Sequence, residues 1–74
     1  MSTTDYIKAT AADRGITLTQ DQMTFAILDM ESAIFNHYMR VNSWIAAGIE
    51  YEESAAVCDY AAKAKAAIRQ AINS

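Results

Sequence analysis

Proline is absent from this 74-residue chain, and glycine occurs only at positions 15 and 48. Because tight turns depend largely on these two residue types, the chain has few places at which it can reverse direction. Hydrophobic residues make up 53% of the sequence, and many of them are alanine, the strongest helix former. We therefore predict an all-α protein with one helical domain over the whole chain, its helices at about residues 4–14, 20–47 and 50–72.

The central helix has the clearest start and stop signals. Thr19 is followed three residues later by Gln22, the spacing of a capping box in which each side chain accepts a hydrogen bond from the other residue's backbone N–H. No helix breaker follows until Gly48, which predicts a helix about 42 Å long at 1.5 Å per residue. We expect Gly48 to end this helix in a Schellman motif, with Ile49 against Trp44.

The first helix is short and has one apolar side. We expect Thr3 or Thr4 to cap its N-terminus and Gly15 to end it with a positive φ angle. Tyr6 and Ile7 are its only large apolar residues. Since a helix of this length is marginal alone, it must dock through these two side chains.

A helical wheel places two separate apolar stripes on the central helix. The first, which we expect to face the core, comprises Met23, Ile27, Met30, Ile34, Val41 and Ile45, flanked by Ala26, Ala33, Tyr38 and Trp44. The second comprises Leu28, Phe35, Met39 and Ala46, with Phe25 at its margin. The third helix offers one stripe of mostly small residues, namely Val57, Ala61, Ala64, Ile68, Ala71 and Ile72.

One thin helix cannot cover both stripes, and an apolar patch left exposed usually marks an interface. The candidate interface residues are Phe25, Leu28, Phe35 and Met39. We therefore expect the short first helix to be followed by a long antiparallel helical hairpin, and two chains to complete a helical bundle as a homodimer. An alternative is a parallel coiled coil through Ile27, Ile34 and Val41, although the repeat spans only about three heptads.

The negative charges are concentrated in one part of the sequence, and the net charge is −3. A candidate acidic surface comprises Glu50, Glu52, Glu53 and Asp59. These acids could simply stabilise the third helix, because carboxylates interact favourably with the positive end of the helix dipole, while Lys65 and Arg69 lie toward its negative end. Alternatively, they could attract a basic partner. We expect no direct nucleic-acid binding, because three bases near the C-terminus give few phosphate contacts.

The sequence contains no recognisable catalytic or ligand-binding motif. His37 is the only histidine and has Ala33 and Val41 one turn away, so we expect no metal site. Cys58 is the only cysteine, which we interpret as a small buried hydrophobe, with an intermolecular disulfide as the alternative. We expect no enzyme activity, no cofactor and no membrane span, and a cytoplasmic location.

Two classes of function fit these features. The first is a self-associating, non-catalytic interaction module that works by binding another protein. The second is a phage or mobile-element-type inhibitor that presents an acidic surface to a basic nucleic-acid-binding protein. Salt would distinguish them, because binding through the acidic surface weakens as ionic strength rises, whereas apolar binding persists.

Overall fold

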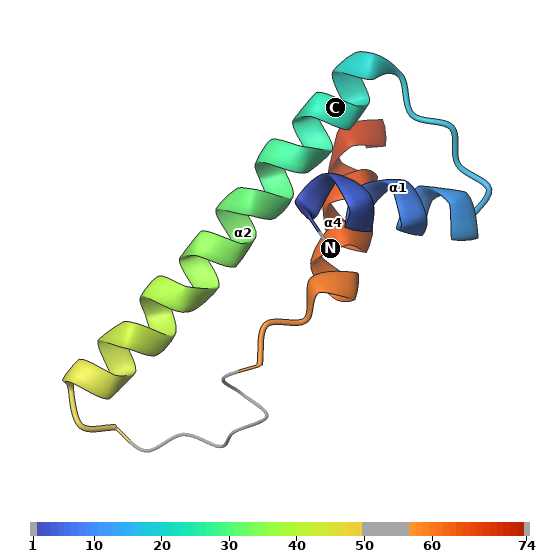
Figure 1. Ribbon diagram of the computed structural model, residues 1–74. Helices are drawn as coiled ribbons and strands as arrows, with labels where there is room; N and C mark the ends of the chain where they lie inside the picture. The colour runs from blue at the N-terminus through green and yellow to red at the C-terminus, as the bar shows by residue number, and fades with distance from the viewer. Residues whose placement is uncertain (1, 50–56, 74) are drawn as a thin grey trace.

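The computed structural model describes residues 2–49 and 57–73, and this part of the chain is helical, with no strand (Figure 1). The helices are α1 (Thr3–Asp13), α2 (Gln20–Ala46) and α4 (Tyr60–Asn73). The all-α prediction is confirmed. The long α2 gives the molecule its elongated shape, with extents of 44 × 21 × 20 Å. In Figure 1, α1 and α4 lie beside the first part of α2, whose last turns extend beyond them.

The N-terminus of α1 is capped one residue earlier than expected. The Ser2 hydroxyl accepts a hydrogen bond from the Asp5 N–H at 3.2 Å, and the Asp5 carboxylate accepts one from the Ser2 N–H at 3.1 Å. Because this reciprocal box requires an acceptor three residues after the cap, Ser2 caps the helix, and Thr3 and Thr4 lie inside it. The hydrogen bond from the Ser2 N–H is the main cause that lowers the pKa of Asp5, followed by the one from the Ser2 hydroxyl.

The start of α2 is confirmed in detail. The Thr19 hydroxyl accepts from the Gln22 N–H at 3.1 Å, while the Gln22 side-chain oxygen accepts from the Thr19 N–H at 2.9 Å. Gly48 at the other end has a φ of 71°, and the Ile49 N–H donates to the Trp44 carbonyl at 3.0 Å. This is the predicted Schellman ending.

The same chemistry ends α1. Gly15 has a φ of 66°, a conformation in which a Cβ atom would be strained. The Ile16 N–H donates to the Ala11 carbonyl at 2.9 Å, and the Gly15 N–H donates to the Ala12 carbonyl at 3.1 Å. The chain thus turns sharply out of α1, and a short connection leads to α2.

The last helix begins later than expected. We predicted a start near residue 50, which lies outside the described residues, but residues 57–59 are not helical and α4 begins at Tyr60. The physical reason is Asp59, whose carboxylate accepts a hydrogen bond from the Ala62 N–H at 3.0 Å. The Asp59 carbonyl accepts from the Lys63 N–H at 3.1 Å. Asp59 therefore acts as the N-cap of α4 rather than as an internal helical residue.

The core lies where the three described helices meet. Its buried members are Ile7 and Ala11 from α1, Ala26 and Met30 from α2, and Ala64, Ala67, Ile68 and Ala71 from α4. Five of these eight residues are alanine, so the backbones of the helices can approach closely. The large side chains Ile7 and Met30 are fully buried. The predicted docking of α1 through Ile7 is confirmed, with Tyr6 packed at the edge of the core.

Several expected core residues are instead exposed. They are Tyr38, Ile45, Val57, Ala61 and Ile72. Ile45 is 59% exposed because α4 starts at Tyr60, beside Tyr38, and leaves the last turns of α2 outside the three-helix core. Val57 precedes α4 and is 63% exposed, so it does not continue the apolar stripe of that helix. Within the described parts, the core is shorter than the apolar pattern of α2 predicts.

Candidate functional site

One side of α2 exposes large apolar side chains to solvent. These are Phe25 (42% exposed), Leu28 (60%), Phe35 (64%) and Met39 (51%). Every residue that we selected from the sequence as a candidate interface residue is therefore accessible in the single chain. That another molecule covers them stays a prediction.

The spacing of these residues brings them into one row. Steps of three, seven and four residues separate Phe25, Leu28, Phe35 and Met39, and such steps recur along one side of an α-helix. Ser32 lies in the same row, and a shallow depression is lined by Leu28, Ser32 and Phe35 together with Glu31 and Asn36. We call Phe25, Leu28, Ser32, Phe35 and Met39 the α2 row. Its four apolar side chains are interrupted by Ser32 and bordered by Glu31 and Asn36, and such a mixture of apolar and polar groups is common in protein interfaces.

A cluster of three tyrosines joins the helices at the edge of the core. The Tyr6 and Tyr60 rings are stacked with their centroids 5.4 Å apart, and the hydroxyls of Tyr38 and Tyr60 lie 2.9 Å apart in a hydrogen bond. This bond is the largest cause that raises the pKa of Tyr60 to about 12, and burial adds to it. The raised pKa extends the pH range over which the Tyr60 hydroxyl stays protonated and keeps this hydrogen bond.

The sequence did not predict this tyrosine cluster. Tyr38 and Tyr60 are 22 positions apart, and only the placement of the α4 start beside α2 brings their hydroxyls together. No local spacing rule relates two residues at such a separation. The cluster fixes the first turn of α4 to the middle of α2 and to α1.

The candidate acidic surface is only partly visible. Glu50, Glu52 and Glu53 lie outside the described residues. Asp59 is exposed, and its carboxylate caps α4 through the Ala62 N–H. This carboxylate thus has a structural role at the positive end of a helix.

The residues that could carry chemistry are not brought together. Across residues 2–49 and 57–73, no three His, Cys, Asp or Glu side chains gather in a way that could hold a metal ion. Cys58 is a free thiol, only 8% exposed. The ring of His37 meets that of Tyr38 edge to face at 5.4 Å. None of the described helices is both long and apolar enough to cross a membrane.

Comparison with known proteins gives no relative from which a function could be transferred. No family model, curated protein or solved structure matches this chain.

Proposed function

We propose that this protein is a self-associating, non-catalytic interaction module that forms a homodimer through the α2 row and acts by binding another protein. The observation that carries the proposal is the joint exposure of Phe25, Leu28, Phe35 and Met39 along one helix face. Single exposed apolar residues are normal on protein surfaces, but contiguous apolar patches commonly mark interaction sites.

The α2 row could supply about half of a dimer interface. If a fully exposed side chain of this size offers roughly 200 Å², the four apolar residues together expose about 400 Å². Two copies would bury about 800 Å² through these residues alone, roughly half of a standard protein interface. Polar neighbours such as Glu31 and Asn36 would add to that area. In a two-fold dimer the α2 row of each copy would face the same row of the other.

In the proposed dimer, α2 and α4 of each chain form the antiparallel hairpin. Tyr60 at the start of α4 is bonded to Tyr38 in the second half of α2. Asn73 at the other end of α4 borders the same pocket as Ile16, which precedes α2. Two such hairpins, joined along the α2 rows, would make a helical bundle with α1 on the outside of each chain.

The test is the solution mass, measured by light scattering after size exclusion in a dilution series. We expect a dimer for the natural chain and a helical monomer for Phe35→Asp. Phe35 exposes about 130 Å², worth at most about 3 kcal/mol per chain on burial. The matched control is Ile45→Asp, which introduces the same charge at a similarly exposed residue (59%) on another side of α2.

The two variants decide the proposal together. A monomeric Phe35→Asp beside a dimeric Ile45→Asp supports the α2 row as the interface. A natural chain that stays monomeric at every concentration, or a Phe35→Asp variant that still dimerises, contradicts the proposal. A dimer that dissociates when salt is raised would also contradict the proposal, because it would indicate ion pairs between the copies and not apolar contact through the α2 row.

A further inference from the structure

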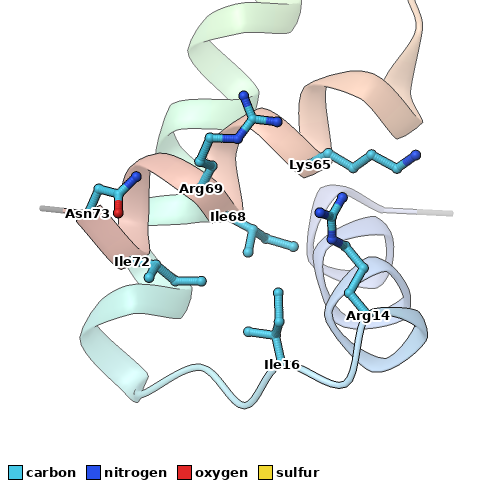
Figure 2. Close-up of a pocket in the computed structure, with 7 residues that line it drawn as sticks. All are labelled: Arg14, Ile16, Lys65, Ile68, Arg69, Ile72 and Asn73. Atoms are coloured by element: carbon cyan, nitrogen blue, oxygen red, sulfur yellow. The ribbon is translucent and has the colours of Figure 1, made fainter.

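A pocket lies between the end of α1, the connection to α2, and α4 (Figure 2). Its lining residues are Arg14, Ile16, Lys65, Ile68, Arg69, Ile72 and Asn73. Figure 2 shows the three isoleucines turned toward the centre, with Arg14 and Lys65 on the α1 side, Arg69 projecting from α4 above Ile68, and Asn73 beside Ile72. The pocket thus has an aliphatic floor and a polar, cationic rim. It shares no residue with the α2 row.

The rim concentrates positive charge on an acidic protein. The whole chain has six Lys and Arg residues against nine acids, and three of the six line this one pocket. Among residues 2–49 and 57–73, those that line the pocket include no carboxylate. Arg14 comes from the end of α1 and the other two cations from α4, so the fold, and not the sequence order, brings them together. Local charge of one sign attracts ligands of the opposite sign.

The dimensions and chemistry of the pocket narrow the class of ligand. Its volume of about 140 Å³ is below the roughly 300–1,000 Å³ of sites that enclose a small molecule. It suits a single aliphatic side chain. The described residues that line it include no aromatic ring, so they offer no stacking platform for a nucleic-acid base. Three cations are also fewer than the basic clusters of about four to eight that recognise anionic membranes.

We propose that this pocket binds an acidic peptide segment of a partner protein. One aliphatic side chain of the segment would rest on Ile16, Ile68 and Ile72, and neighbouring carboxylates would pair with Arg14, Lys65 and Arg69. Arginine forms paired hydrogen bonds with carboxylates, which gives the contact direction as well as charge. This site is independent of self-association through the α2 row.

The test uses the full chain and a fluorescent peptide that carries one leucine flanked by glutamates, with binding followed by polarisation. Arg14→Gln and Arg69→Gln should each weaken binding by roughly 2- to 5-fold, the range for exposed ion pairs. Lys8→Gln is the matched control, because Lys8 is an exposed cation of α1 that does not line the pocket. Ile72→Ala should also weaken binding, since Ile72 is 45% exposed and its truncation spares the buried core.

Further measurements keep the result decisive. A peptide with glycine in place of leucine should bind more weakly, and equal binding would reduce the site to charge alone and overturn the proposal. The same holds if Lys8→Gln weakens binding as much as Arg14→Gln, or if phosphatidylserine vesicles bind while the peptide does not. Lower thermal stability of Arg14→Gln with unchanged peptide binding would assign the cation to the C-terminal dipole of α1 instead. Light scattering of each variant should show unchanged self-association, which separates this test from that of the dimer.

Discussion

Two separate variants, Met30→Ala and Met39→Ala, test the core and the α2 row with the same chemical change. Met30 is fully buried among Ile7 and the alanines of α4, whereas Met39 is 51% exposed on the α2 row. Met30→Ala removes three heavy atoms from the core, a change that typically costs about 2–5 kcal/mol. A chain of 74 residues is expected to have roughly 4–11 kcal/mol of folding stability. Met30→Ala should therefore remove a large part of it.

Met39→Ala should behave differently, because its exposed half contributes nothing to the stability of a single chain. If the α2 row is buried in a dimer, this change weakens association by about 1 kcal/mol per chain, or roughly 30-fold in the dissociation constant for two chains. The assay is urea unfolding followed by helical circular dichroism at two protein concentrations a hundred times apart. The loss in Met30→Ala should be similar at both concentrations, while the loss in Met39→Ala should depend on concentration. A Met30→Ala variant within about 1 kcal/mol of the natural chain would refute the placement of Met30 in the core.

Two further predictions follow from the capping and tyrosine contacts. Thr19→Ala should destabilise the protein by about 1 kcal/mol, because it removes the acceptor for the Gln22 N–H. The control is Thr17→Ala, since Thr17 lies outside any helix. Equal effects of the two substitutions in thermal melts would contradict the capping role of Thr19. In a titration of tyrosinate absorbance, Tyr38→Phe should lower the pKa of Tyr60 from about 12 toward its ordinary value of 10.0, since the hydroxyl hydrogen bond is the main cause of the shift. Because the raised pKa means that the folded state favours the neutral phenol, this contribution to stability is complete below about pH 10 and lost as the pH rises through about 12. An unchanged titration of Tyr60 in Tyr38→Phe would rule out the bond as that cause.

Local features of the fold were predictable because their physical cause lies within a few residues. The Thr19 box, Gly15 and Gly48 each depend on a spacing of no more than five positions, and all three were confirmed. The start of α4 was misjudged for the opposite reason. Asp59 follows several acids, and any of these could occupy the first turn of a helix. The sequence alone does not show which of them is the N-cap whose carboxylate accepts a backbone hydrogen bond.

For the candidate surfaces, helical periodicity predicts which residues share a helix face but not which of them a neighbouring helix covers. Helical periodicity identified Phe35 and Met39 as a stripe apart from Met30, and the structure exposes the first two and buries the third. Periodicity does not tell how far a neighbouring helix reaches, so Ile45 was assigned to the core although α4 does not cover it. The cationic pocket was missed because Arg14 and Arg69 come from different helices, and no sequence spacing relates them.

The alanines buried between the helices also affect the entropy of folding. Ala64, Ala67 and Ala71 of α4 have no side-chain rotamers to lose when they are buried, whereas larger core side chains lose about 0.5–2 kcal/mol each in rotamer freedom. Burying a core rich in alanine therefore costs little side-chain conformational entropy per residue. Alanine also buries little apolar area. The free energy that offsets the loss of backbone entropy therefore comes chiefly from burial of Ile7, Met30 and Ile68. In the proposed dimer, contact between the α2 rows would supply apolar area that the alanines of the core do not.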